Sequence, residues 1–406
     1  MEFKNKTLAN GLTIVGEVNP AAQSAAVGFF TRAGARDETD AINGVSHFLE
    51  HMMFKGTEDL SALEVNEAFD RLGAKFNAFT SEENTVYYAA VLPEYIEEVT
   101  ELWSKLMRPS LRDDDFNMEK NVIKEEIAMY KDLPQFDVMD QARALHFRGH
   151  RCSQSVLGSN ESIDALTSEQ MRGYFAEHYA PNNMVLACCG NIDFDAICKL
   201  AEANCSSWQS TEVSREISFF EGTREKQHNE KANLVREHIC LVSPAVSAQD
   251  ERRFAASLLA VILGDYTGSR YFWGLVDTAL AEIAAMQFES MDGVGALYSY
   301  IRCSSENADK VMEIVASIFA DVAKNGVTED ELQKAKNKAL SALTIKNETP
   351  MGRLVDLGFN WVYLKQYRLI DEDIAAVNAV TVDGINAIVK EFRPGDFTQF
   401  VIGPAK

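Results

Sequence analysis

The chain has 406 residues, of which 46% are hydrophobic and 25% are charged, a composition typical of globular proteins with about two or three domains. Its 39 Lys and Arg against 61 Asp and Glu give a net charge of −22. A field of this sign repels phosphate backbones, which argues against a nucleic-acid partner. No apolar run reaches the ~18 residues of a membrane-spanning helix, and the N-terminus lacks the apolar core of a secretory signal. We therefore expect a cytoplasmic chain with no membrane partner.

The first half of the sequence alternates strand and helix patterns. Strands are expected at Leu12–Val18, Ala25–Thr31, Lys75–Phe79, Thr85–Val91 and Met184–Cys189. Helices are expected at Ile42–Phe54, Pro93–Met107, Phe116–Tyr130, Val138–Phe147 and Thr167–Tyr179. A further helix is expected to begin at Ser61. Two of these helices begin with the spacing of a capping box, Ser61 with Glu64 and Thr167 with Gln170.

The second half repeats the strand-to-helix pattern of the first, after a polar stretch without periodicity. His238–Leu241 followed by Ala255–Ile262 corresponds to Ala26–Phe30 followed by Val45–His51, about 211 residues earlier. Later helices are expected at 305–324, 329–345, 351–363 and 381–392, and a strand at 398–402. We predict an α+β protein built as two diverged copies of one unit, with domains at 1–212 and 233–406 and a linker at 213–232.

Seven cysteines complete the compositional picture, at positions 152, 188, 189, 198, 205, 240 and 303. Their number is odd and no two are spaced as Cys-x-x-Cys. This pattern favours reduced thiols over a disulfide framework or a zinc knuckle.

A short segment near residue 50 carries the chemistry. His47 and His51 are spaced i and i+4, so on a helix both imidazoles project from one face. Two imidazoles held in this way can bind Zn²⁺, and Glu50 on the same face can accept a proton from water. A catalytic zinc site needs a third protein ligand.

Acidic residues on a later helix offer that ligand. Glu119 and Glu126 lie two turns apart on one face, beside Ile123 and Ile127. Carboxylates on a half-buried face are costly unless they are paired or bound to metal. Either segment alone is compatible with an ordinary solvated surface, whereas the two together indicate a metal site.

The histidine motif, His47-x-x-Glu50-His51, resembles the inverted zinc motif of the pitrilysin/insulin-degrading-enzyme family. The 75 residues from His51 to Glu126 (126 − 51) also match that family. Further segments are similar to the branch that contains the mitochondrial processing peptidase β subunit: Gly44–Thr57, Asn77–Thr80, Val122–Ile127, Tyr179–Leu186 and Gly264–Arg270.

The resemblance implies a zinc endopeptidase that hydrolyses peptides in an enclosed chamber. It assigns one Zn²⁺ per chain to His47, His51 and Glu126, the general base to Glu50, and the orientation of a ligand to Glu119. It also implies two α/β-roll domains, each a mainly antiparallel sheet packed by helices, in a clam-shell assembly with a homologous subunit as a homo- or heterodimer.

The same resemblance places substrate along one edge strand. Asn77, Ala78, Phe79 and Thr80 would bind a peptide by β-strand addition, in which backbone hydrogen bonds give affinity. An ordinary core strand is an equally good interpretation of these residues.

One departure from the family is in the second half of the chain. Many members carry there an Arg and, seven residues later, a Tyr that polarise the substrate carbonyl. Counting on from Ser269-Arg270-Tyr271-Phe272, these positions hold Val276 and Ile283, which cannot donate hydrogen bonds. We expect a homologous subunit to supply the pair; a shifted register, or an enzyme that works without it, are the alternatives.

A non-catalytic core-like subunit and a peptide-binding module are the functions that compete with a zinc endopeptidase.

Overall fold

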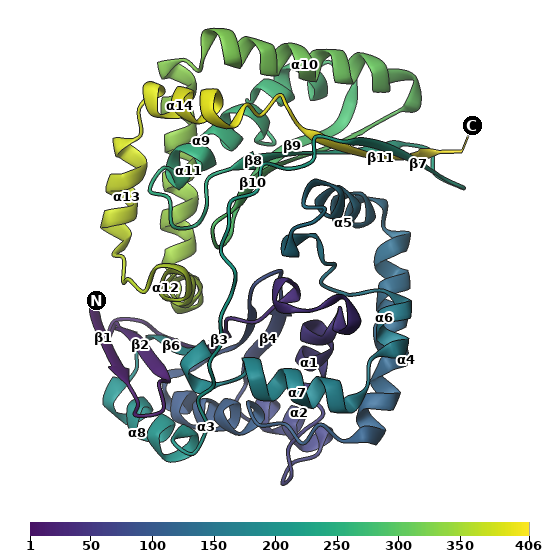
Figure 1. The fold of residues 1–406 in the computed structure, drawn as a ribbon. Helices are drawn as coiled ribbons and strands as arrows, with labels where there is room; N and C mark the ends of the chain where they lie inside the picture. Colours follow the sequence, from purple (N-terminus) through teal and green to yellow (C-terminus); the bar gives the residue numbers. More distant parts are fainter. Residues whose placement is uncertain (406) are drawn as a thin grey trace. The chain divides into compact units, whose positions relative to one another are not determined.

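The computed structural model describes residues 1–405, which form two compact units. Unit 1 comprises residues 1–128, 154–215 and 344–368, and unit 2 comprises 129–153, 216–343 and 369 onward. Figure 1 shows the elements of both units in the order of the chain. Each compact unit is assembled from three segments of the chain. The units therefore differ from the predicted domains, whose boundaries at 212 and 233 follow the sequence repeat.

Unit 1 is built on a six-stranded sheet with strand order β1-β2-β6-β3-β5-β4. Its strands are β1 Glu2–Thr7, β2 Thr13–Val18, β3 Ala25–Thr31, β4 Lys75–Thr80, β5 Thr85–Val91 and β6 Met184–Gly190. β2 and β6 run parallel, and every other neighbouring pair is antiparallel. The central strands β3 and β6 are buried over their whole length, which explains why Thr31 is the one polar residue in their sequences.

Eight helices belong wholly or mainly to unit 1: α1 Val45–Met53, α2 Ala62–Arg71, α3 Ile96–Leu106, α4 Asp113–Asp132, α6 Asn160–Ala165, α7 Ser168–His178, α8 Phe194–Cys205 and α12 Pro350–Leu364. One sheet face packs on most of them through a core that includes Phe29, Phe48, Tyr87 and Trp103. The predicted capping boxes are confirmed at the starts of α2 and α7.

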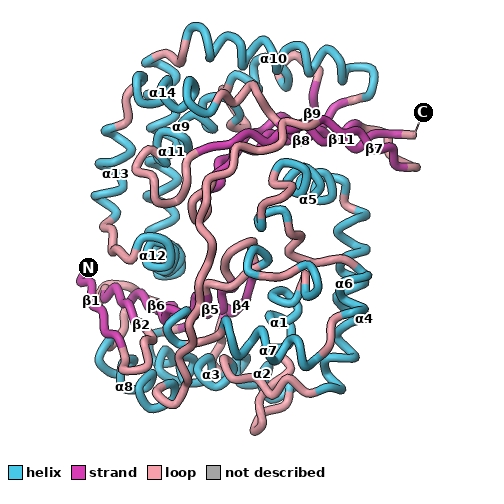
Figure 2. Tube along the Cα trace, viewed as in Figure 1, coloured by secondary structure: helices cyan, strands magenta, loops and turns pink. Residues whose placement is uncertain are grey.

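Unit 2 is built on a five-stranded sheet with strand order β7-β11-β8-β10-β9. Its strands are β7 Lys226–Lys231, β8 Glu237–Ala245, β9 Ala281–Ser290, β10 Gly295–Cys303 and β11 Thr398–Pro404. Its helices are α5 Pro134–His146, α9 Arg253–Gly264, α10 Ala308–Asn325, α11 Glu329–Asn347, α13 Ile370–Ala379 and α14 Val382–Phe392. The two sheets and their helices can be followed by colour in Figure 2.

The two units repeat one topology, as the sequence predicted. The order β2-β6-β3-β5-β4 corresponds to β7-β11-β8-β10-β9, and in each sheet only the first of these pairs is parallel. Helix α1 follows β3 in the same way that α9 follows β8. The extra strand β1 distinguishes unit 1 from its repeat.

Each sheet is covered on its second face by a helix from the other half of the sequence. Helix α12 packs on β2, β3 and β6, where Leu354 and Leu357 join a core with Phe30 and Val185. Gly358 permits this approach, because a Cβ there would lie 2.2 Å from the Phe30 ring. Helix α5 likewise packs on β8 and β11.

The linker predicted at 213–232 contains regular structure that the sequence did not indicate. Residues 226–231 form β7, which pairs in parallel with β11 at the sheet edge. All six residues of β7 are polar, and five are exposed. An edge strand without a buried face shows no apolar alternation, so the pattern that identifies strands was absent.

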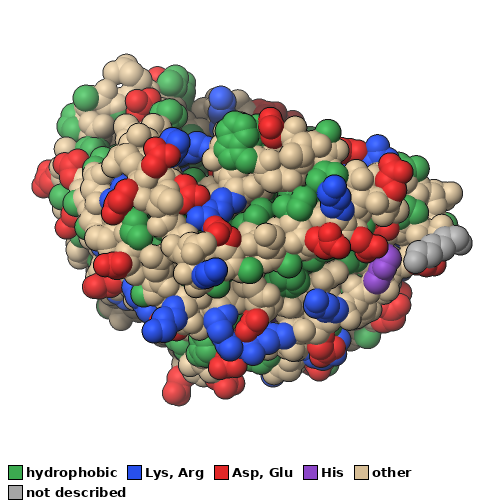
Figure 3. Space-filling view, turned by 90° about the horizontal axis from the view of Figure 1, so that it is seen from above, with side chains coloured by type: hydrophobic (Ala, Val, Ile, Leu, Met, Phe, Trp, Pro, Cys, Tyr) green, Lys and Arg blue, Asp and Glu red, His purple; other side chains and the backbone are tan. Residues whose placement is uncertain are grey.

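Charged side chains of both signs lie on the surface of the chain. On the face shown in Figure 3, Asp and Glu side chains are interspersed with Lys and Arg. All seven cysteines lie within residues 1–405, are buried and form no disulfide bond. Within residues 1–405, no helix combines the length and the apolarity that crossing a membrane requires.

Candidate metal centre

Helix α1 holds both histidines and Glu50, and its start is fixed by an unusual cap. The N-cap residue is Gly44 at φ 93°, which has no side chain to accept from the first backbone amides. Glu38 accepts instead, from the amides of Gly44 at 2.6 Å and Ser46 at 2.8 Å and from the Asn43 side chain at 2.9 Å. Glu38 is fully buried, and this burial raises its pKa to about 8. The first turn of α1, which leads directly to His47, is thereby satisfied.

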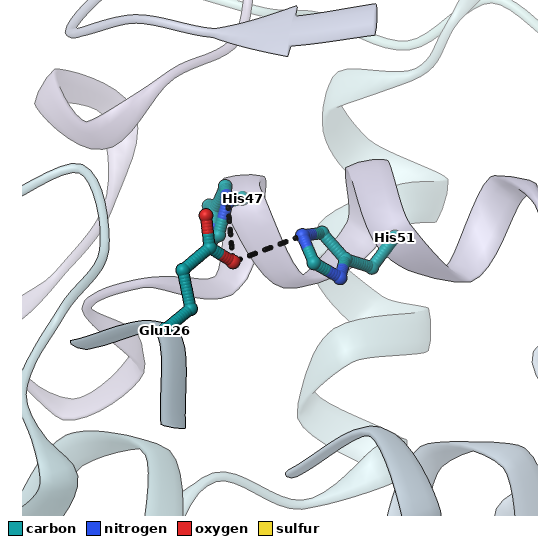
Figure 4. Close-up of side chains that lie close together, drawn as sticks. All are labelled: His47, His51 and Glu126. Carbon is teal, nitrogen blue, oxygen red and sulfur yellow. Dashed lines mark ion pairs between the residues drawn. The ribbon is translucent and has the colours of Figure 1, made fainter. Parts of the chain in front are cut away.

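Three side chains predicted as metal ligands converge in unit 1. Figure 4 shows the His47 and His51 imidazoles facing one carboxylate oxygen of Glu126 from α4. The Glu126 Oε2 atom lies 3.7 Å from His47 Nε2 and 3.4 Å from His51 Nε2. One ligand atom from each of the three residues lies within 4.8 Å of the others.

This geometry fits a zinc ion. With bonds of ~2.0–2.1 Å, ligand atoms in a tetrahedral zinc site lie about 3.4 Å apart. Two imidazole nitrogens and one carboxylate oxygen are a donor set that catalytic zinc sites use, and three protein ligands leave a position for water. The residues present could therefore hold zinc without large movement.

The two imidazoles differ in their electrostatic surroundings. Burial, together with the neighbouring His51, lowers the pKa of His47 to about 4, so this ring is neutral near pH 7. Burial also acts against a proton on His51, but hydrogen bonds to Glu119 and Glu126 outweigh it and raise the pKa of His51 to about 9. The His51 hydrogen bond contributes most to the lowered pKa of Glu126.

Glu50 projects from α1 beside the candidate ligands without joining them. Its Oε2 atom accepts a hydrogen bond of 2.5 Å from the Thr80 hydroxyl. Burial raises the pKa of Glu50, while the Thr80 hydrogen bond opposes the rise. The arrangement suits a carboxylate that exchanges a proton rather than one that binds metal.

Glu119 lies behind the three candidate ligands, next to His51. It is 3% exposed, and its Oε1 atom is 2.9 Å from His51 Nδ1. Its Oε2 atom is 2.5 Å from the Lys55 ammonium. Although burial opposes ionisation, hydrogen bonds from His51 and Lys55 lower the pKa of Glu119.

The predicted substrate strand is an edge strand of the sheet. β4 pairs with β5 on one side, and its other side has no strand partner among residues 1–405. Along β4, Asn77 is exposed, Ala78 is buried, and Phe79 and Thr80 are half-buried. The strand thus contributes to the core through some side chains and has one edge without a strand partner in the described part of the chain.

The positions expected for the family's Arg and Tyr lie in unit 2. Val276 ends a π-helical turn at Phe272–Val276, and Ile283 lies in β9. Both are partly buried against apolar clusters. Between them the chain turns at Ala279, whose φ is 57°. As they stand, neither side chain can donate a hydrogen bond to a carbonyl.

Two residues that contact α1 or Glu119 were missed from the sequence, Glu38 and Lys55. Glu38 caps α1 across a loop, and no periodic pattern indicates such a contact. Lys55 is four residues after His51, a spacing that could have suggested a shared partner, but the partner Glu119 lies 64 positions further on (119 − 55).

Comparisons with known proteins agree over nearly the whole chain. Residues 13–160 match the model of the insulinase family, peptidase family M16, and residues 165–339 match the peptidase M16 inactive domain. The "Uncharacterized zinc protease YmxG" of Bacillus subtilis is 31% identical over 405 residues, covering 99% of this chain and 98% of that protein.

Solved structures share the fold. A protease from Helicobacter pylori superposes with a TM-score of 0.91 at 20% identity, covering 99% of each chain. A chain in the structure of complex III2 from Candida albicans with Inz-5 bound gives 0.83 at 18% identity, covering 98% of this chain and 95% of that one.

Proposed function

Because the chain belongs to the insulinase family of peptidases, peptidase family M16, we propose that it is a zinc-dependent endopeptidase acting on peptides or unfolded segments. The observation that carries this proposal is the convergence of His47, His51 and Glu126, with Glu50 beside them on the same helix. Zinc bound there would supply a Lewis acid that polarises the scissile carbonyl and activates water.

Glu50 acts as the general base in this proposal. Its carboxylate takes a proton from the attacking water and gives it to the leaving amine, which keeps the proton count balanced over the reaction. The Thr80 hydroxyl holds Glu50 Oε2 and fixes its rotamer. Since Thr80 ends β4, the base and the proposed substrate strand are joined by one hydrogen bond.

The free edge of β4 supports peptide binding by strand addition. Backbone hydrogen bonds along Asn77–Thr80 would hold an extended substrate irrespective of its side chains. Such a binding mode requires an unfolded segment, because a folded substrate has already paired its own backbone groups. This supports peptides and unfolded segments as the substrate class.

Removing the metal tests the function directly. We expect one zinc per chain after purification, and we expect chelation to lower cleavage of an unstructured quenched-fluorescent peptide by at least about 10²-fold. Adding zinc back should restore cleavage, whereas magnesium should not, because it prefers oxygen ligands in octahedral geometry. Cleavage that continues after the zinc has been shown to leave would contradict the proposal.

We further propose that full activity needs a homologous partner subunit. The support is that Val276 and Ile283 stand where many family members place carbonyl-polarising donors. One missing donor of this kind typically lowers the rate by about 10²–10³-fold. The partner's own Arg and Tyr would then complete the site.

The partner proposal predicts a rate increase on mixing. Adding a co-purifying homologous chain that carries the Arg and Tyr should raise peptide cleavage by about 10²–10³-fold over this chain alone. A partner variant with its Arg replaced by Leu serves as the matched control and should give no increase. Cleavage by the lone chain at the rate of the mixture would contradict partner dependence.

A further inference from the structure

Lys55 is placed to act on the metal centre through Glu119. It follows the C-terminal end of α1, and its ammonium lies 2.5 Å from Glu119 Oε2. The other oxygen of the same carboxylate lies 2.9 Å from His51 Nδ1. The far nitrogen of that ring, Nε2, faces Glu126. A continuous chain of polar contacts therefore runs from Lys55 to the position of the metal.

The other imidazole has no such support. The Nδ1 atom of His47 is buried and has no hydrogen-bond partner within the described part of the chain. Metal-binding histidines usually have the second ring nitrogen held by a carboxylate or carbonyl, which fixes the tautomer and the ring orientation. Of the two imidazoles, only that of His51 has this arrangement. The orientation of the His51 ring therefore depends on how firmly Glu119 is held.

Glu119 needs a cation to hold it. A carboxylate that is 3% exposed is costly to bury unless a positive group compensates it. The structure provides one ammonium in direct contact, from Lys55, whose own side chain is 30% exposed. From these contacts we propose that Lys55 is a positioning residue for the zinc site, which fixes Glu119 so that Glu119 can orient His51. This inference rests on the proposed role of His47, His51 and Glu126 as zinc ligands.

The alternative is that Lys55 only stabilises α1. A cation after a helix C-terminus interacts favourably with the helix dipole, whatever its partner. The two roles differ in what they require of Glu119. A positioning role acts through Glu119 and disappears when that carboxylate is removed, whereas a dipole effect remains.

Zinc affinity, measured by competition with a chromophoric chelator, tests the proposal without any assay of activity. Lys55→Met should weaken zinc binding by about 10–100-fold, the usual effect of losing such support. Lys55→Arg keeps the charge and the donors and should recover most of the affinity. Lys105→Met is the control, because Lys105 makes an exposed ion pair with Glu101 on α3, and it should bind zinc like the wild type.

A double-mutant cycle separates the two roles. In a Glu119→Gln background, adding Lys55→Met should weaken zinc binding by less than about threefold, because coupled residues lose their effect together. Equal zinc affinity of Lys55→Met and wild type, or a full additive loss in the double variant, would overturn the proposal. Failure of the wild type to bind zinc would instead overturn the proposed function.

Discussion

Glu50→Gln is expected to keep its zinc and to lower the rate of peptide cleavage by a factor of about 10²–10⁴, the usual contribution of a general base. Glu50 is not among the three residues whose ligand atoms converge. Its carboxylate contacts Thr80 instead. The amide of Gln can accept the same hydrogen bond but cannot take a proton, so geometry is kept while chemistry is lost. Zinc content and kcat on one unstructured peptide measure both parts.

Matched variants make the result specific. Glu125→Gln changes an exposed carboxylate on α4 next to Glu126 and should leave both zinc content and kcat unchanged. Glu126→Gln should lose zinc as well as cleavage, because it removes the only anionic ligand among the three. A Glu50→Gln variant that cleaves at the wild-type rate would exclude Glu50 as the base. If neither the wild type nor Glu50→Gln cleaved the peptide, the result would favour the interpretation that the chain is a binding module.

Local sequence signals predicted helix α1, which holds the two candidate histidine ligands. The i, i+4 spacing of His47 and His51 depends only on helix geometry, and α1, Val45–Met53, lies within the helix expected at Ile42–Phe54. The strands β3 and β5 and the capped starts of α2 and α7 follow from equally local patterns. In each case the information lies within about one turn or one hairpin of the residue concerned.

The candidate third ligand, Glu126, required more than local signals. Glu126 is one of several acidic residues on α4, and the helix pattern separates it from Glu125 only by placing it on the same face as Glu119. Its assignment depended on the resemblance and its spacing from His51. The structure adds an independent reason, because Glu126 is the carboxylate that reaches both imidazoles.

Contacts between distant polar residues were not predictable. Glu38 and Lys55 each act across a loop or between helices, through hydrogen bonds that leave no periodic trace in the sequence. These contacts are therefore evident only in the folded structure. The same holds for the polar edge strand β7, which buries no face.

The sequence also did not predict that α5 and α12 each cover the sheet formed mainly by the other half of the sequence. An apolar helix face shows that the helix covers something, but it does not say which of two equally apolar sheets it covers. In unit 1 a polar contact joins α12 to the sheet that it covers. Arg353 of α12 donates to both carboxylate oxygens of Glu17 on β2, at 2.8 and 2.5 Å, and both residues are at most 4% exposed.

Replacing Arg353 with Met should therefore loosen α12 from the first sheet by about 3–5 kcal/mol, the usual result of removing one partner of a buried ion pair. Glu17 would keep its hydrogen bond from Tyr367 at 2.7 Å but would remain as a buried charge without a cation. Hydrogen exchange of the α12 amides measures this opening, and it should accelerate by about 10²–10⁴-fold.

Two comparisons identify the cause of that loosening. Lys346→Met removes an ion pair with Asp356 that is 49% exposed on the lysine side, and it should cost at most about 1 kcal/mol. Glu17→Gln combined with Arg353→Met should recover part of the loss, because the unpaired buried charge is then gone. If the α12 amides of Arg353→Met exchanged hydrogen at the wild-type rate, the apolar contacts of Leu354 and Leu357 alone would hold α12 on the first sheet. The ion pair would then mark the position of α12 without securing it.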